Sequence, residues 1–176
     1  MTDGSLGLEF VLLDPDRHDR ASFTSGEASL DRYVLRQATQ DIRRGLCVAY
    51  VYAEVATGRI LGYYTLSAWS IQPEGLPFSV TRRLPRYDAY PASLIGRLAV
   101  DEDFQGRRVG SKLVADALRR SSEPAESLGI LAVVVDALDE RAAAYYRRFG
   151  FAPFEDDELR LFMTIAEVNR IVRPAR

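Results

Sequence analysis

The sequence predicts a single α/β domain in which a mixed central sheet of about six to seven strands is flanked by helices. Short runs rich in Val, Ile and Tyr alternate with segments whose apolar residues recur at helical spacing. Hydrophobic residues make up 47% of the chain and charged residues 27%, a globular balance that argues against a disordered or fibrous protein. Neither an internal repeat nor a linker is visible, so residues 1–176 are expected to form one domain.

The first half of the chain predicts a strand, a helix and a hairpin. Residues 8–13 are short and apolar, which suits a first strand. A helix is expected from about residue 27 to residue 44, where apolar residues recur every four positions, and Gly45 is the expected stop. Residues 46–55 and 59–71 are rich in β-formers and flank a Thr-Gly pair, so they predict an antiparallel hairpin.

The middle of the chain predicts a long loop, a strand and a second helix. Residues 72–92 carry four prolines and are expected to form a loop with room for one short helix. Long loops in compact domains tend to be functional. Residues 93–100 predict a strand, and apolar residues at helical spacing predict a helix over about 106–121.

The last third predicts one more helix between strands. The continuous apolar run 130–136 is typical of a strand buried on both faces. Asp139 is suited to cap a helix over about 140–149. Residues 151–154 and 159–165 are expected to be the closing strands.

A candidate phosphate site lies where the strand 93–100 leads into the following helix. Gln105-Gly106-Arg107-Arg108-Val109-Gly110 places two glycines at the helix entrance. First-turn amides lack intrahelical partners and the helix dipole there is positive, so such a terminus accepts a pyrophosphate. Arg107 and Arg108 add cationic charge. The glycines alone favour an ordinary strand-to-helix turn.

Composition excludes several other classes of protein. The single cysteine, Cys47, makes an internal disulfide impossible, and its apolar neighbours favour a core position. No apolar run approaches the roughly 20 residues of a membrane span, and the N-terminus lacks the features of a signal peptide. A cytoplasmic protein without membrane contact is the simplest expectation. The net charge of −2 argues only weakly against a nucleic-acid partner.

Arginines form two clusters along the chain. One lies on the first helix, away from its apolar stripe, and the other lies in the proline-rich loop and the strand after it. The first comprises Arg32, Arg36, Arg43 and Arg44, and the second Arg82, Arg83, Arg86 and Arg97. Two interpretations stay open, a solvated helix face with a basic loop, or a surface that binds the backbone of a folded RNA.

The phosphate loop resembles the acetyl-coenzyme A motif of the GNAT superfamily, Gln/Arg-x-x-Gly/Ala-x-Gly/Ala after a Leu-x-Val strand. Gln105, Gly110 and the strand 98–100 match, whereas Arg108 stands where the family has glycine or alanine. The resemblance implies a single GNAT-like domain that uses acetyl-coenzyme A and no metal. The cofactor-binding residues it implies are Leu98, Ala99, Val100, Gln105, Gly106, Arg107, Arg108, Val109, Gly110 and Ser111. Leu98 and Val100 are expected to act through their main chain, with their side chains in the core.

The segment 142–151 resembles the family pattern Phe/Tyr-Tyr-x-x-x-Gly-Phe, and Tyr146 aligns with its second aromatic residue. In many GNAT enzymes a tyrosine here lies beside the coenzyme A sulfur. A phenol with a pKa of about 10 can protonate the thiolate that leaves when an amine attacks a thioester. Tyr146 is therefore the catalytic candidate, and Tyr145 is interpreted as a core aromatic residue. The alternative is that both tyrosines belong to the core.

No strong general base is visible in the sequence. The only histidine, His18, lies in a polar segment and is expected to be a solvated surface residue, and no glutamate stands out on the central strands. An α-amine, with a pKa of about 7.7–8.0, needs less help to lose its proton than a lysine side chain does. This favours an α-amine as the acetyl acceptor.

Over about residues 8–166 the chain resembles the GNAT toxins of type II toxin–antitoxin pairs. The resemblance is carried by Phe23-x-Ser25-Gly26, by Leu30-Asp31-x-Tyr33, by Ile95-Gly96-Arg97 and by the ending 150–162. It implies acetylation of the amino group of aminoacyl-tRNA, a block of translation, a ribbon-helix-helix antitoxin and a homodimer. Which aminoacyl-tRNA is modified does not follow from it.

Two alternatives stay open. One is a GNAT enzyme that acetylates a small-molecule or protein amine, which would be active without RNA. The other is a non-catalytic module that binds acyl-coenzyme A or RNA.

Overall fold

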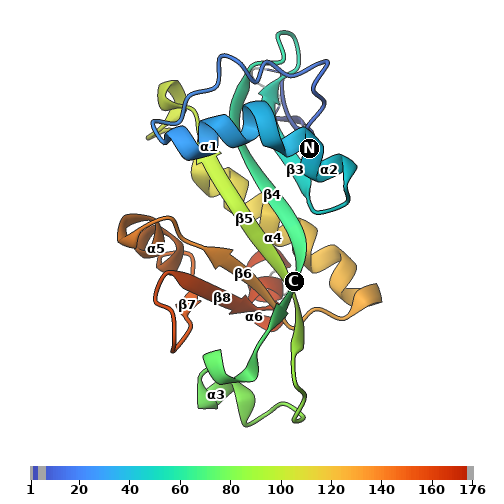
Figure 1. The fold of residues 1–176 in the computed structure, drawn as a ribbon, viewed down its shortest axis with the longest axis vertical. Coiled ribbons are helices and arrows are strands. Elements are labelled where there is room, and N and C mark those ends of the chain that lie inside the picture. Colours follow the sequence, from blue (N-terminus) through green and yellow to red (C-terminus); the bar gives the residue numbers. More distant parts are fainter. Residues whose placement is uncertain (1, 4–6, 174–176) are drawn as a thin grey trace. The chain divides into compact units, whose positions relative to one another are not determined.

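The computed structural model describes residues 2–3 and 7–173, drawn in Figure 1. Its contacts divide the chain into two compact units, Met1–Ser67 with Gly96–Ala117, and Ala68–Ile95 with Leu118–Arg176. Met1, residues 4–6 and residues 174–176, which the predicted domain includes, lie outside the described residues. One domain over residues 1–176 stays a prediction.

Each unit contains part of three long elements. These are strand β4 (Ile60–Ile71), strand β5 (Tyr90–Val100) and helix α4 (Val109–Leu128). The α/β class with a mixed sheet flanked by helices is confirmed. The described residues form eight strands, because β1 (Thr2–Asp3) adds a two-residue strand before those expected from the sequence.

In the first unit, the strand order is β1-β2-β3-β4-β5. Strand β2 (Leu8–Leu12) pairs antiparallel with β1 and with β3 (Val48–Glu54), and β3 and β4 form the predicted antiparallel hairpin. The predicted helix 27–44 is continuous but has three parts, α1 (Ala28–Arg32), the π-helical turn η1 (Tyr33–Gln37) and α2 (Ala38–Arg43). The wide turn starts with two adjacent buried side chains, Tyr33 and Val34.

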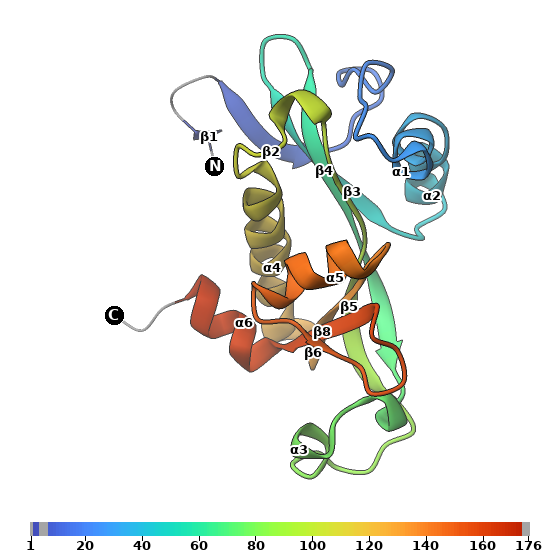
Figure 2. The same cartoon turned by 90° about the vertical axis from the view of Figure 1, so that its left-hand side faces the viewer.

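The hairpin buries both of its faces, and alternate residues serve opposite faces. Val51 and Tyr63 pack in the same cluster as Val34 and Ala38 of the helix α1–α2. On the other face, the Tyr64 hydroxyl donates a hydrogen bond to Asp116 of α4 at 2.5 Å. Figure 2 shows α1 and α2 on one side of β3 and β4, and α4 on the other.

Glycine is required where α4 crosses the hairpin. A Cβ at Gly62 would lie 2.7 Å from Leu113 Cδ1 and 2.9 Å from the carbonyl oxygen of Ala99. Those distances are below any that real Cβ atoms adopt, so a side chain at this position would push the helix or the strand away.

In the second unit, the strand order is β5-β6-β8-β7. Strand β6 (Ala132–Asp136) pairs parallel with β5 and antiparallel with β8 (Arg160–Thr164), and β7 (Ala152–Pro153) pairs with β8. The three central valines of β6 are fully buried, which confirms the interpretation of its apolar run. The predicted loop 72–92 contains η2 (Pro73–Gly75) and α3 (Phe78–Thr81), and its last residues already belong to β5.

Helices of the second unit differ from the prediction in two places. Helix α4 continues to Leu128, through Pro124, instead of ending near residue 121. Buried Ser122 anchors this part, because its hydroxyl donates to Asn169 Oδ1 at 2.6 Å. Helix α6 (Ile165–Val172) follows β8 and was not expected from the sequence. Helix α5 (Glu140–Arg147) begins at its predicted cap, Asp139, whose side chain accepts the amide of Ala142.

Candidate functional site

A nest of main-chain amides opens helix α4. After β5 and the short turn η3 (Glu102–Phe104), Gly106 and Arg108 adopt left-handed φ values of 75° and 62°. When left-handed and right-handed backbone conformations alternate along a loop, successive N–H groups point toward one concave surface. Such a surface suits an anion. The amide of Lys112 donates to the Arg108 carbonyl at 3.1 Å, as in a regular helix. The amides of the residues before Lys112 belong to the first turn, which lies ahead of the regular helical hydrogen bonds. The pyrophosphate site stays a prediction with which this backbone conformation is compatible.

Arg108 is the one non-glycine residue with positive φ in residues 2–3 and 7–173. This conformation favours glycine, which the related motif allows at this position. A left-handed conformation costs a residue with a Cβ about 1–2 kcal/mol. The Arg108 side chain is exposed, so its main chain still takes part in the nest.

Gln105 has a structural role that the sequence did not reveal. Its Nε2 donates to the carbonyl oxygens of Ser25 at 2.9 Å and of Val100 at 3.0 Å. The Val100 carbonyl, which was expected to face the cofactor, therefore already accepts a hydrogen bond. The side chains of Leu98 and Val100 are half-buried, whereas Ala99 and Val109 are buried in the core.

Asp101 was missed by the sequence analysis, although it organises this loop. Its side chain is buried and accepts the amides of Thr24 and Asp103, each at 3.1 Å. The amide of Glu102 donates in return to the Thr24 carbonyl at 2.8 Å. The neighbouring residue Ser25 donates through its amide and its hydroxyl to Asp31 of α1. The phosphate loop is thus connected to the turn that precedes α1.

Tyr146 is held in α5 by two aromatic contacts. Its ring makes edge-to-face contacts with Tyr145 and Phe151, with centroids 5.8 Å apart in both pairs. The residue is 6% exposed. Burial, with a smaller contribution from Tyr145, raises the pKa of Tyr146 above its ordinary value. A tyrosine phenol is protonated at neutral pH even at its ordinary pKa of about 10, and the upward shift makes it a weaker acid.

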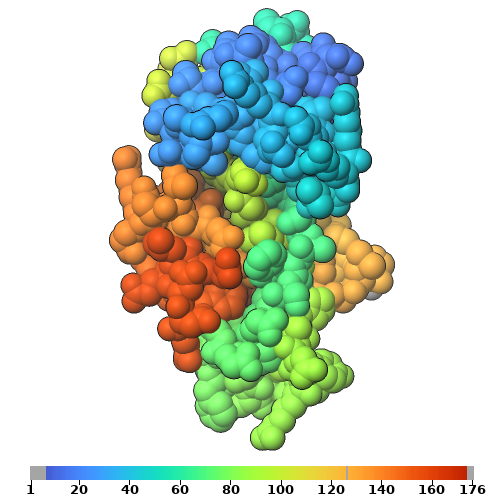
Figure 3. All heavy atoms as spheres, viewed as in Figure 1, coloured from blue at the N-terminus to red at the C-terminus, as the bar shows by residue number. Residues whose placement is uncertain are grey.

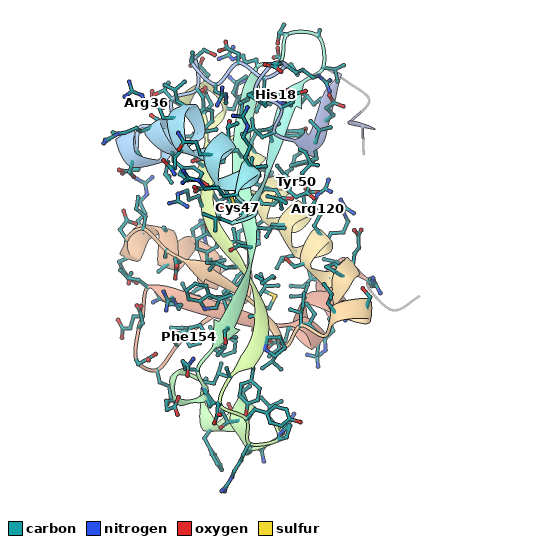
Figure 4. All side chains as sticks on the ribbon, turned by 45° about the vertical axis from the view of Figure 1, so that its right-hand side comes forward. His18, Arg36, Cys47, Tyr50, Arg120 and Phe154 are labelled. Carbon is teal, nitrogen blue, oxygen red and sulfur yellow. The ribbon has the colours of Figure 1, made fainter. Side chains whose placement is uncertain are left out.

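The first arginine cluster is exposed on the helix α1–α2. Arg32, Arg36, Arg43 and Arg44 all present their side chains to solvent, and Figure 4 shows Arg36 on the outer side of the helix. Arg97 lies with this cluster, because its guanidinium stacks 3.7 Å above the centre of the Tyr33 ring. The grouping of Arg97 with the arginines of the proline-rich loop stays a prediction. The strand carries Arg97 into the first unit, whereas Arg82, Arg83 and Arg86 are exposed in the second.

Tyr33 connects Arg97 to two further side chains. Its hydroxyl donates to Asp41 Oδ2 at 3.0 Å and lies 3.4 Å from the sulfur of Cys47. Burial, followed by the contact with Cys47, raises the pKa of the Tyr33 phenol. Cys47, labelled in Figure 4, is half-buried and so only partly fits its predicted core position.

His18 is not the solvated residue that its polar neighbours predicted. The side chain is 5% exposed, and Nδ1 accepts the amide of Asp14 at 2.9 Å. Its buried Nε2 has no hydrogen-bond partner in the described residues. Burial is the main reason that the pKa of His18 lies below 6.5, and the nearby Arg17 lowers it further. The histidine therefore stabilises a turn and has no role in the site that the geometry supports.

Within the described residues, no cluster of histidine, cysteine, aspartate and glutamate side chains could hold a metal ion. Over the same residues, no helix is long and apolar enough to cross a membrane.

Comparison with known proteins identifies a family and several relatives. Residues 44–153 match the model of the acetyltransferase (GNAT) domain. A "tRNA-acetylating toxin" of Mycobacterium tuberculosis strain H37Rv is 36% identical over 157 residues, which cover 89% of this chain and 92% of that protein. A "probable toxin TacT" of Sinorhizobium fredii is 31% identical, covering 91% of this chain and 92% of the relative.

Solved structures resemble the whole described fold. AtaT complexed with acetyl-methionyl-tRNAfMet has a TM-score of 0.87 at 28% identity, covering 93% of this chain and 98% of that one. AtaTR bound with AcCoA has a TM-score of 0.82 at 28% identity, covering 94% and 98%. A mutant AtaT toxin bound to the C-terminus of the antitoxin AtaR has a TM-score of 0.83 at 26% identity, covering 95% and 99%.

Proposed function

Because the chain belongs to the acetyltransferase (GNAT) family, we propose that it is a toxin that transfers the acetyl group of acetyl-coenzyme A to the α-amino group of aminoacyl-tRNA, blocking translation. The observation that carries the proposal is the 36% identity to a tRNA-acetylating toxin over 89% of this chain. The absence of a strong base from the sequence agrees with an α-amine acceptor, because such an amine is partly neutral near pH 8.

The part of the proposed site that binds acetyl-coenzyme A, the acetyl donor, is the nest at the start of α4. The amides of residues 106–111 bind the pyrophosphate of acetyl-coenzyme A, and Arg107 adds positive charge. The main chain of Leu98 and the amide of Val100 remain the groups proposed to bind the pantetheine arm, since the Val100 carbonyl accepts from Gln105. The structure of a relative with AcCoA supports this choice of donor.

Tyr146 is the proposed general acid. The acceptor nitrogen forms a bond to the thioester carbonyl carbon, the carbon–sulfur bond breaks, and the sulfur leaves as a thiolate. The Tyr146 hydroxyl, which is protonated at neutral pH like any tyrosine phenol, donates its proton to that thiolate. The amine releases its own proton to solvent, and the tyrosine regains a proton from water.

The exposed arginines are the proposed contacts to the tRNA backbone. Arg32, Arg36, Arg43, Arg44 and Arg97 supply them in the first unit, and Arg82, Arg83 and Arg86 in the second. Binding through phosphates should weaken steeply with salt, because each contact releases counterions. A salt-independent Michaelis constant for tRNA would contradict this assignment.

Homodimerisation and neutralisation by a ribbon-helix-helix antitoxin are also proposed. The AtaT structure with the C-terminus of AtaR supports an antitoxin partner. The dimer rests on the resemblance to the toxin family alone. A cytoplasmic location is proposed as well, because tRNA is aminoacylated there. Co-expression with the antitoxin should restore growth, and sedimentation should report the dimer.

The decisive experiment uses labelled acetyl-coenzyme A with total charged tRNA. Uncharged tRNA is the control, and Tyr146→Phe is the variant that tests the chemistry. Label should appear on charged tRNA only. Label on neither RNA, or equally on both, would refute the proposal. Transfer to small or protein amines without RNA would favour a different acetyltransferase, and coenzyme A binding without turnover would favour a non-catalytic module.

A further inference from the structure

The segment after β4 exposes two aromatic rings among three arginines. Phe78 is 76% exposed and Tyr87 63%, compared with 37% for Trp69. We call this set the α3 surface, and its members are Phe78, Arg82, Arg83, Arg86 and Tyr87. All three arginines are exposed. Figure 3 shows the segment in green with its atoms at the surface. Leaving such rings in water costs free energy unless a partner covers them.

The framework under the α3 surface is well anchored. Val80 and Leu84 are one helical turn apart. Both pack against a cluster of buried residues that includes Leu76, Tyr90 and Phe154. Phe78 and Arg82 are also one turn apart, and the Arg82 amide donates to the Phe78 carbonyl at 2.9 Å. These two side chains are exposed while Val80 and Leu84 pack inward. The exposure of Phe78 therefore follows from how α3 is docked, with its inner side already occupied.

The end of this segment, from Pro85 to Tyr90, is also held in place. Tyr90 is buried, and its hydroxyl donates to the Pro85 carbonyl at 2.7 Å, closing the chain between them. The rings of Tyr87 and Tyr90 have centroids 6.3 Å apart, so Tyr87 rests on a buried neighbour and leaves its outer side free for contact. Arg86 and Tyr87 thus extend the surface begun by Phe78 and Arg82.

We propose that the α3 surface binds unpaired nucleotides of the RNA substrate, with bases stacked on Phe78 and Tyr87 and phosphates contacted by the three arginines. The inference rests on the proposed aminoacyl-tRNA substrate. Exposed aromatic rings beside arginines are the combination used by proteins that bind single strands. Between Phe78 and Tyr90 the sequence carries these three arginines and one acidic residue, Asp88, so the segment has a net positive charge that suits a polyanion. A protein interface would need a contiguous apolar centre, which the arginines between the two rings interrupt.

The test measures binding of the full-length protein to two forms of one uncharged tRNA, with and without the unpaired nucleotides at its 3′ end. Removing them should weaken binding of the wild-type protein. The double variant Phe78→Ala/Tyr87→Ala should bind intact tRNA about 5- to 150-fold more weakly for each stacked base lost. It should no longer distinguish the two RNAs. Tyr87→Phe keeps the ring and should bind like the wild type.

Salt dependence separates stacking from charge. Phe78→Ala/Tyr87→Ala should leave the slope of log affinity against log salt unchanged, because no phosphate contact is lost. Arg82→Gln and Arg86→Gln should each reduce the slope by about 0.7, as expected for a contact to a single strand. Leu138→Ala removes an exposed apolar side chain elsewhere in the second unit and should change neither affinity nor slope. Circular dichroism and thermal unfolding verify that each variant is folded.

The outcomes that overturn the inference are distinct from those that overturn the proposed function. If wild-type protein acetylates charged tRNA but the double variant binds both RNAs as the wild type does, the α3 surface does not bind RNA. Unchanged RNA binding together with loss of a dimer in sedimentation, or of binding to anionic phospholipid vesicles, assigns the surface to a second copy or to a membrane instead. If no charged tRNA is acetylated, the proposed function fails whatever the RNA-binding result.

Discussion

Replacing Arg108 tests whether the nest at the start of α4 is strained. Arg108 has a φ of 62°, a conformation that costs a residue with a Cβ about 1–2 kcal/mol. Glycine removes this strain, although its freedom in the unfolded chain costs about 0.5–1 kcal/mol. Arg108→Gly should therefore raise the free energy of unfolding by up to about 1.5 kcal/mol. Arg108→Ala keeps the strain and, as an exposed substitution, should stay within about 0.5 kcal/mol of the wild type.

The assay is denaturant unfolding of the three proteins side by side, with the midpoint followed by fluorescence and by circular dichroism. Both variants remove the same positive charge, so their difference isolates the backbone. Titration with coenzyme A completes the comparison, since Arg108→Gly and Arg108→Ala should lose the same small electrostatic contribution. An alanine variant more stable than the glycine variant by about 0.5–1 kcal/mol would show that residue 108 is unstrained, because only the freedom of glycine in the unfolded chain would then separate the two.

Three further predictions concern single side chains. Tyr146→Phe should reduce the acetylation rate by about 10²–10⁴-fold with coenzyme A affinity unchanged, measured by single-turnover transfer and calorimetry. Asp101→Asn should lower the free energy of unfolding by about 1–3 kcal/mol, because an amide nitrogen would face an amide that Asp101 now accepts. The pKa of His18 is lower in the folded protein than in the unfolded chain. The contribution of His18 to the free energy of unfolding is therefore fully present above pH 6.5 and is lost as the pH falls through the folded pKa. Urea midpoints between pH 7.5 and pH 5 should therefore fall less in His18→Asn than in the wild type.

Each of these predictions has a result that contradicts it. Full turnover by Tyr146→Phe would leave Tyr146 as a core aromatic residue only. An Asp101→Asn variant with wild-type stability, while Asp103→Asn serves as the exposed control, would mean that the buried carboxylate does not hold the loop together. Parallel pH curves for His18→Asn and the wild type would place the acid sensitivity in other groups.

The sequence predicted what is local and missed what joins distant segments. The apolar run of β6 and the hairpin of β3 and β4 are confirmed because hydrophobic pattern alone determines them. Helix α6 was overlooked because Thr164 and Glu167, which form its capping box, follow directly on an apolar strand. That Thr-x-x-Glu spacing was the signal that could have revealed it.

The site was predicted to a similar extent. Strand, glycines and helix start placed the nest at residues 105–110, but the role of Asp101 depends on Thr24, 77 positions earlier in the chain. His18 was misjudged for the same reason. Its neighbours in sequence are polar, whereas its burial is set by the tertiary packing around the turn that begins at Asp14.

The bonds between the turn at Thr24–Ser25 and the loop at Asp101–Gln105 restrict how this protein can be re-engineered. Three hydrogen bonds join the two segments, from Thr24 to Asp101, from Glu102 to Thr24 and from Gln105 to Ser25. A chimera that receives only the loop corresponding to residues 101–105 from another acetyltransferase would leave Thr24 and Ser25 next to residues that do not match them. Grafts intended to change acyl-donor selectivity therefore need to exchange both segments as one module.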